Sequence, residues 1–210
     1  MRAGQCVRAK HHMMSAPQLA SQSLVKHVLL AAALISLSTL NKAAGFQLSS
    51  PDIKADSQIE KTFEFNGFGC SGENKSPVLQ WSGAPAGTKS FAVTVYDPDA
   101  PTGSGWWHWS VINVPSDIAS LNSDAGAVGG VNLPKGASQV RNDYGVASWG
   151  GMCPPPGDKP HRYIFTVYAL KIDKLEIPTD ATSALAGYMI NANTLAKASF
   201  TATYGRPKAK

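Results

Sequence analysis

Apolar and polar residues alternate in short runs along most of the chain after position 45, which is the pattern of half-buried β-strands. The clearest run is 90–97 (SFAVTVYD), because it is dense in the β-branched and aromatic residues that favour strands. Turn-forming residues, such as those at 83–87 (GAPAG), separate the runs. The runs that predict strands are 46–53, 61–65, 78–81, 90–97, 109–114, 162–170 and 200–204.

One late segment has a helical period instead. Between 181 and 199 apolar residues recur every three or four positions, which predicts an amphipathic helix of about five turns, with Thr179 or Asp180 as its N-cap. The apolar positions are Leu185, Tyr188, Met189, Ala192 and Leu195. The pattern predicts an all-β fold, an antiparallel β-sandwich with one late α-helix at about 181–199.

Residues 115–160 contain few apolar runs and many Gly, Ser, Asp and Pro residues. A long irregular excursion of this kind is usually functional or disordered. The 19 glycines and 14 prolines of the chain also favour many short strands and turns. Neither an internal repeat nor a linker interrupts 45–210, so we expect this range to form one domain.

The first 44 residues have the pattern of a secretory leader. Lys26 precedes an apolar run at 28–40, which is too short to span a bilayer comfortably, and the small residues at 43–45 follow it. We expect cleavage after Ala43 or Ala44 and a periplasmic or secreted mature protein without a transmembrane anchor. A buried or amphipathic helix is the alternative for 28–40, and translation beginning at Met13 or Met14 would give a shorter signal.

The net charge of +5 comes from the leader. Five of the 19 Lys and Arg residues and none of the 14 Asp and Glu residues lie within 1–44, so the remaining chain carries equal numbers of each sign. A body without net charge has no electrostatic footprint for a polyanion. We therefore expect no nucleic-acid partner.

Outside the leader, which contains Cys6, the chain has two cysteines, Cys70 and Cys153. Two thiols in an exporting compartment usually pair, and both lie in loop-like segments. A disulfide closing a loop of about 80 residues would stabilise the domain by roughly 4 kcal/mol. Two free buried thiols are the alternative. We consider a nucleophilic role for Cys153 less favoured than the disulfide, since a sulfur in a disulfide cannot act as a nucleophile.

Three segments carry polar groups where a predicted strand meets a loop. At 97–101 (DPDAP), Asp97 and Asp99 follow the strongest strand, although an ordinary Asx-type turn is the alternative. At 106–109 (WWHW), three tryptophans surround His108, which fits either a small polar ligand or a histidine packed in the core.

The third segment is 150–157 (GGMCPPPG), followed by His161, Arg162 and Tyr163. Its glycines offer backbone N–H groups, which bind anions well. On a strand, His161 and Tyr163 share one face, and Arg162 points to the other, where we expect it to form a structural ion pair.

Together, DPDAP at 97–101, WWHW at 106–109 and CPPPG…PHRY at 153–163 resemble, in order and spacing, the signature segments of the phosphatidylethanolamine-binding proteins. The resemblance covers about 46–206 and is closest to secreted members of the bacterial Raf-kinase-inhibitor-like branch. It implies two antiparallel sheets with a Greek-key connection and a pocket for phosphate-like head groups. The kinase-inhibitor role of the animal branch is not carried over, since a periplasmic protein meets no such kinase.

The resemblance also assigns the pocket residues. They are Asp97, Asp99, His108, His161 and Tyr163, with Trp106, Gly151 and Pro155 lining the mouth. Met152 departs from the family pattern, and we expect it to narrow or reshape the mouth. A carboxylate beside an anion repels it unless a proton or cation lies between, so we expect Asp97 to pair with His108 and to raise the pKa of that histidine.

The expected function is a non-catalytic binding or inhibitory protein. Its partners would be a small anionic or phosphorylated ligand and an unidentified protein, with neither a cofactor nor a metal. The alternatives are a metal-dependent hydrolase that uses the Asp and His residues, and a secreted effector that acts on other cells. Metal-ligand spacing and the G-x-S-x-G motif of serine hydrolases are both missing from the sequence.

Overall fold

The computed structural model describes residues 45–208. The predicted leader, its cleavage site and Cys6 lie outside this range. Among the described residues, no helix has the length and apolar character needed to cross a bilayer.

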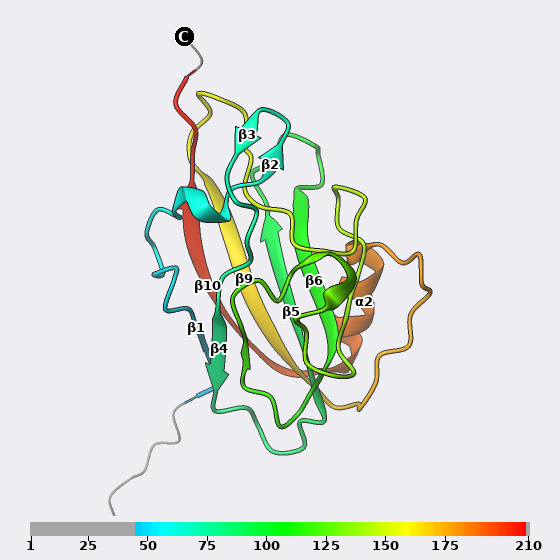
Figure 1. Ribbon diagram of the computed structural model, residues 1–210. Helices are drawn as coiled ribbons and strands as arrows, with labels where there is room; N and C mark the ends of the chain where they lie inside the picture. The colour runs from blue at the N-terminus through cyan, green and yellow to red at the C-terminus, as the bar shows by residue number, and fades with distance from the viewer. Residues whose placement is uncertain (1–44, 209–210) are drawn as a thin grey trace, which may run out of the picture. The chain divides into compact units, whose positions relative to one another are not determined.

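The core of the domain is a sheet of five strands in the order β10-β9-β5-β6-β8, and every neighbouring pair is antiparallel (Figure 1). Its strands are β5 (Ser90–Asp97), β6 (Trp106–Pro115), β8 (Ser138–Gln139), β9 (His161–Leu170) and β10 (Thr194–Tyr204). Strand β9 returns to lie beside β5, so that β5, β6, β8 and β9 stand in the spatial order 9-5-6-8. This is the Greek-key arrangement that the family resemblance implies.

Two further sheets are small. The three-stranded sheet β1-β4-β7 consists of β1 (Gln47–Ser49), β4 (Leu79–Ser82) and β7 (Ser120–Leu121). The pair β2 (Asn66–Gly67) and β3 (Cys70–Ser71) forms a hairpin in the loop-like segment that contains Cys70. Two short 3-10 helices, η1 (Lys61–Phe63) and η2 (Val128–Gly130), complete these connections. The prediction of a strand at 61–65 is therefore wrong, since the 3-10 helix η1 occupies most of this range.

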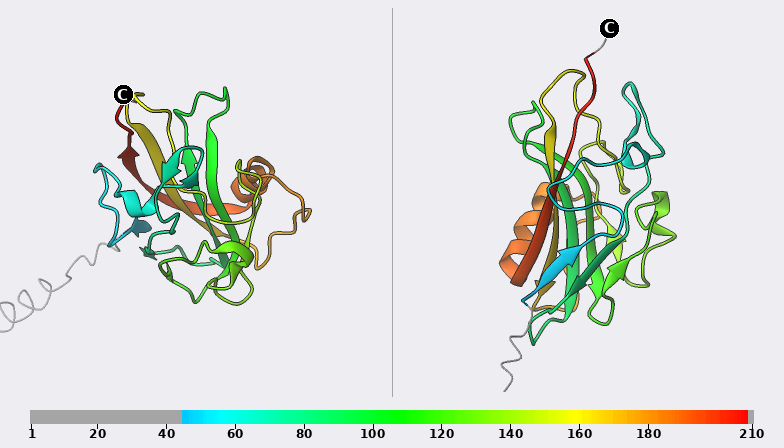
Figure 2. Two further views of the ribbon diagram at one scale, coloured as in Figure 1. Left: turned by 45° about the horizontal axis from the view of Figure 1, so that its top comes forward. Right: turned by 90° about the vertical axis from the view of Figure 1, so that its left-hand side faces the viewer.

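Apolar side chains cover both faces of the main sheet. On one face, Val93, Trp109 and Phe165 join a large core that also contains Trp81 from β4. On the other face, Ala92 and its neighbours pack against helix α2 (Ser183–Asn193). Figure 2 shows α2 on the opposite side of the sheet from β1 and β4. Strand β5 is buried on both faces, which explains its almost continuous apolar run.

The late helix exists, but it is shorter than predicted and uses another N-cap. The side-chain oxygen of Thr182 accepts a hydrogen bond from the backbone N–H of Leu185, and the helix ends at Asn193 rather than 199. From Thr194 onward the chain pairs with β9 along nearly the whole of that strand. A ladder of interstrand hydrogen bonds outweighs the helical propensity of the Ala-rich sequence, which is a weak local preference.

The buried face of α2 also differs from the predicted one. Ser183, Ala186 and Ile190 are buried, whereas Leu185 and Tyr188 are exposed. Small side chains on the inner face let the helix approach the sheet closely. The apolar spacing therefore indicated a helix correctly, but Leu185 and Tyr188 lie on its outer side, and of the predicted apolar positions within the helix only Met189 packs against the cluster beneath it.

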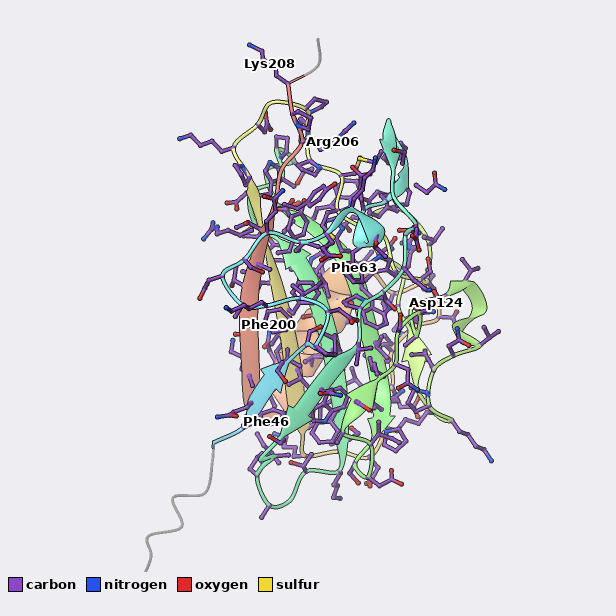
Figure 3. All side chains as sticks on the ribbon, turned by 60° about the vertical axis from the view of Figure 1, so that its left-hand side comes forward. Phe46, Phe63, Asp124, Phe200, Arg206 and Lys208 are labelled. Atoms are coloured by element: carbon purple, nitrogen blue, oxygen red, sulfur yellow. A yellow bond between two sulfur atoms is a disulfide. The ribbon has the colours of Figure 1, made fainter. Side chains whose placement is uncertain are left out.

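The predicted disulfide is confirmed. Cys70 in β3 is bonded to Cys153, and their Cα atoms lie 6.0 Å apart. Arg206, which lies at the opposite end of the domain from Phe46 (Figure 3), donates hydrogen bonds to the carbonyl oxygens of Gly69 and Pro154, beside the two cysteines. The β2–β3 hairpin and the 150–157 loop are thus tied together at this end.

Candidate ligand pocket

Three strands of the main sheet meet at one end of the domain, and each contributes polar residues there. Strand β5 ends at Asp97, while β6 begins at Trp106 and β9 begins at His161. Because β9, β5 and β6 are neighbours with alternating directions, the end of β5 and the starts of β6 and β9 lie at the same end of the sheet (Figure 1). Segments 9 and 64 residues apart from Asp97 are brought together in this way.

A cavity of about 180 Å³ lies at this end of the sheet. Six of the residues predicted for the pocket line it: Asp97, Trp106, His108, Pro155, His161 and Tyr163. Residues from the loops complete the lining, namely Phe68, Ala100, Pro101, Thr102, Tyr144, Cys153 and Pro154. The walls are therefore mainly aromatic rings and prolines, with few polar atoms.

A β-bulge directs His108 toward the cavity. Val95 pairs with Trp109 and Tyr96 pairs with Trp107, so His108 is an extra residue without a partner on β5. The extra residue changes the alternation of side chains, as bulges do beside many functional sites. As a result His108 lies against the cavity although the next residue, Trp109, belongs to the large core on the same face.

His108 does not pair with Asp97, so that prediction is wrong. Its Nδ1 lies 2.7 Å from the carbonyl oxygen of Gly150 and 3.1 Å from that of Gly151. Burial lowers the pKa of His108, and the two carbonyls and the charge of Asp97 offset this only in part. The expectation failed because the bulge turns the ring toward the 150–151 backbone, which the sequence does not reveal.

Asp97 pairs with His161 instead. Its Oδ2 lies 2.8 Å from Nδ1 of His161, and both side chains are almost fully buried. Its Oδ1 accepts a hydrogen bond from the backbone N–H of Asp99 at 2.8 Å, which is the Asx turn considered for this segment. On the other side of the ring, Nε2 of His161 lies 3.6 Å from Oδ2 of Asp158, which is half exposed. The carboxylate thus fixes the orientation of His161 at the cavity wall.

Three lining residues contain a buried polar atom without a hydrogen-bond partner. These are Nε1 of Trp106, Nε2 of His108 and the hydroxyl of Tyr163. Burial, and secondarily the charge of Asp97, raises the pKa of Tyr163, so its hydroxyl remains protonated. Only six such atoms occur in the described part of the chain, and half of them belong to this one cavity. Unpaired buried polar groups are costly, and their concentration here indicates a binding site.

Tyr144 was not predicted, yet it contacts much of the pocket. Its ring stacks on Phe65 at 4.2 Å and meets Trp106 edge to face at 5.2 Å. Its hydroxyl donates a hydrogen bond of 2.8 Å to the carbonyl oxygen of Gly151. It lies in the irregular 115–160 excursion, where no periodicity marks any residue. The only available signal was that long excursions are often functional.

Asp99, although predicted in the pocket, faces away from it. Its carboxylate binds the guanidinium of Arg162 through two hydrogen bonds of 2.7 and 2.9 Å and accepts a third, of 2.8 Å, from the backbone N–H of the same residue. Arg162 therefore forms the structural ion pair that its position on β9 predicted. The i and i+2 spacing of the two carboxylates does not bring them to one site, since the Asx turn reverses the direction of the chain between them.

The Asp99–Arg162 pair predicts an acid-dependent contribution to stability. The hydrogen bond from Arg162 lowers the pKa of Asp99 from 3.8 to about 2. A pKa that is lower in the folded state stabilises the protein above about pH 4, and the contribution is lost as the pH falls toward 2. We expect Asp99→Asn to be slightly destabilised in urea at pH 7 and to converge with the wild type between pH 4 and pH 2. A constant difference over that range would contradict this assignment.

The two expectations for 151 and 152 are also wrong. The backbone N–H of Gly151 donates to Oδ1 of Asn74 at 2.8 Å, and Gly151 does not line the cavity. It supports the pocket with its carbonyl oxygen, which accepts hydrogen bonds from His108 and Tyr144. Met152 is fully buried in the large core, so it does not shape the mouth. A β-bridge between Glu64 and Met152 draws this segment inward.

Among residues 45–208, no group of three or more His, Cys, Asp or Glu side chains is arranged to hold a metal ion.

The fold and the cavity define a small antiparallel β-sandwich with a mainly apolar pocket that holds a few polar atoms at one end of its main sheet. The chain belongs to the phosphatidylethanolamine-binding protein family, whose sequence model matches residues 49–205. Within the family it falls in the UPF0098 branch. It is 56% identical to UPF0098 protein YbcL of Escherichia coli strain K12 over 163 residues, which cover 78% of this chain and 89% of YbcL. It is 46% identical to UPF0098 protein YbhB of the same strain over 158 residues, covering 75% and 99%.

Solved structures agree with this assignment. The crystal structure of E. coli YbcL, described as a new member of the mammalian PEBP family, matches with a TM-score of 0.76 and covers 77% of this chain and 99% of its own. A PEBP homologue from Chlamydia trachomatis, CT736, matches with a TM-score of 0.64 at 28% identity, covering 77% and 98%. The predicted family and fold are confirmed.

Proposed function

We propose that the protein is a non-catalytic binding protein whose pocket holds the phosphate-like group of a small molecule or a phospholipid head group. The unpartnered polar atoms of Trp106, His108 and Tyr163 around one cavity carry this proposal. The indole N–H and the phenol O–H are neutral donors directed at no protein acceptor, and the oxygens of an anion would satisfy both. The family's name supports the same ligand class.

The size of the cavity restricts the ligand. Its volume of about 180 Å³ is below the roughly 300–1,000 Å³ of pockets that enclose drug-sized molecules. A phosphoryl group with a short substituent fits this space, whereas the acyl chains of a lipid do not. Phe68, at the mouth, is 76% exposed and offers an apolar contact to the part of a ligand or partner protein that remains outside.

The hydrogen bonds of the pocket favour binding over catalysis. Nδ1 of His161 is taken by Asp97, Nδ1 of His108 is taken by two backbone carbonyls, and the sulfur of Cys153 is in a disulfide. The nitrogen that would act as a base is therefore Nε2, and within residues 45–208 no lining hydroxyl is hydrogen-bonded to Nε2 of either histidine, so no nucleophile–base pair is formed there. The disulfide and the predicted leader together support a periplasmic or secreted location.

Matched aromatic variants test the pocket. We expect Trp106→Phe and Tyr163→Phe each to weaken binding of phosphorylethanolamine about tenfold or more, because each removes one donor to a charged oxygen. The controls are Trp107→Phe, which changes a ring that packs on Tyr96 at 4.6 Å, and Tyr168→Phe, on the α2 side of β9. Isothermal titration calorimetry with phosphorylethanolamine and inorganic phosphate measures the affinities. Equal losses in the pocket variants and their controls, or no binding by the wild type at millimolar ligand, would overturn the proposal.

A further inference from the structure

We propose that the pocket selects a singly protonated phosphoryl group, in which a P–OH donates a hydrogen bond to Nε2 of His108 while the other oxygens accept from Trp106 and Tyr163. The inference rests on the proposed function and narrows it to phosphomonoesters and inorganic phosphate, which retain a hydroxyl on phosphorus. Diesters and sulfate do not meet this requirement at neutral pH.

The tautomer of His108 follows from its contacts. Carbonyl oxygens only accept hydrogen bonds, so the nitrogen that lies 2.7 and 3.1 Å from those of Gly150 and Gly151 carries the proton. In a neutral imidazole the other nitrogen, Nε2, is then an acceptor. That atom is buried without a partner, the residue is only 2% exposed, and its ring lines the cavity. No described protein group donates to Nε2 of His108, so a ligand in the cavity is the group that must supply this donor.

The surroundings keep His108 neutral. Burial lowers the pKa of His108, and this effect is larger than the opposing effects of Asp97 on β5 and Asp143 in the excursion. Tyr144 from the excursion and Tyr163 from β9 face the ring edge to face at 5.7 and 5.1 Å. Burial raises the pKa of both tyrosines, so they add no charge. The carboxylate of Asp97 is directed at His161 rather than at His108.

The charge of the cavity points to the same ligand. Its lining contains a buried carboxylate, that of Asp97, and neither Lys nor Arg is among the lining residues that the structure describes. The dianion of a phosphomonoester would face this carboxylate and would also offer no hydrogen to Nε2 of His108, whereas the dianion of inorganic phosphate keeps one hydroxyl but carries the same double charge. The monoanion of a phosphomonoester carries half the charge and one hydroxyl. It satisfies the two donors and the one acceptor of the site together.

The test compares methyl phosphate, dimethyl phosphate and sulfate by calorimetry on the whole protein at pH 6.0, 7.0 and 8.5. Because the second pKa of a phosphomonoester is near 6, we expect the apparent affinity for methyl phosphate to fall about thirtyfold from pH 7.0 to 8.5. Titrations in two buffers of different ionisation enthalpy should show uptake approaching one proton per ligand above pH 7. At pH 6.0, dimethyl phosphate and sulfate should bind at least about tenfold more weakly, since neither donates to Nε2.

His108→Asn provides a second readout. Its amide NH₂ can still donate to the Gly150 carbonyl, but the acceptor at the position of Nε2 is lost. We expect the preference for methyl phosphate over sulfate to disappear in this variant. The wild-type comparison stands alone if the variant does not fold.

The outcomes separate the two proposals. Equal binding of methyl phosphate and sulfate, with or without proton uptake, would overturn the inference and leave the anion pocket intact, because His108 would then not require a donor from the ligand. Absence of binding by all three compounds at every pH would overturn the proposed function itself.

Discussion

Replacing Cys70 and Cys153 together by serine is expected to lower the free energy of unfolding by about 4 kcal/mol. The bond closes a loop with a sequence separation of 83 residues, and its loss frees this loop in the unfolded chain. Cys153 also lines the cavity, and the partner loop carries Phe68 at the mouth. The same variant should therefore bind phosphorylethanolamine more weakly, because two walls of the pocket are no longer tied together.

Urea unfolding of the wild type and the double variant, both under oxidising conditions, measures the stability effect. Wild-type protein reduced with excess dithiothreitol is the control, since it loses the same bond without a change in sequence. Its midpoint should approach that of the double variant. A loss below about 1 kcal/mol in both samples would mean that the unfolded chain is already compact across this loop.

Gly151→Ala is expected to destabilise the fold by about 3 kcal/mol and to reduce ligand binding as well. A Cβ at this position would lie 2.2 Å from the carbonyl oxygen of Phe63 and 2.4 Å from the backbone nitrogen of Phe65. Both obstacles are backbone atoms, so no side-chain rotation relieves the overlap. The two segments must separate, which moves the carbonyl that holds His108 and Tyr144.

Gly187→Ala is the matched control for this substitution. Gly187 lies inside α2, where a Cβ would meet only Trp107, at 3.6 and 3.8 Å, which is ordinary van der Waals contact. Alanine in a helix interior is favoured over glycine, so this variant should be stabilised by about 0.5–1 kcal/mol. Thermal unfolding followed by circular dichroism compares the two variants. Effects of the same sign at 151 and 187 would contradict the packing described for the 150–152 segment.

The expected fall in ligand affinity above pH 7 does not depend on the pairing first assigned to His108. The sequence predicted that Asp97 raises the pKa of His108, and loss of that proton would also weaken anion binding as the pH rises. In the structure Asp97 holds His161, and burial lowers the pKa of His108. The same direction now follows from the protonation of the ligand, and sulfate distinguishes these explanations because it remains a dianion throughout the range.

Local pattern was sufficient for the central strands, and the family resemblance of three motif segments was sufficient for most of the pocket. Strands β5 and β9 match the predicted runs to within one residue, because their apolar side chains are buried by any sandwich of this kind. The three motif segments lie at strand ends on the same end of the sheet, so Asp97, His108 and His161 come together as the resemblance implied. The disulfide was predictable because only two cysteines lie beyond the predicted leader, so Cys70 and Cys153 can pair only with each other.

Only tertiary structure decided which atoms of these residues face the cavity. The bulge at His108, the Asx turn that separates Asp97 from Asp99, and the position of Tyr144 each depend on contacts between segments far apart in sequence. The same is true of the helix end at Asn193, where pairing with β9 overrides local propensity. Sequence therefore determined the fold class through the periodicity of its apolar residues, and six of the pocket residues through the three motif segments and the family that they resemble. It did not determine the hydrogen-bond partners, because these are fixed by packing and by the unequal burial of chemically similar side chains.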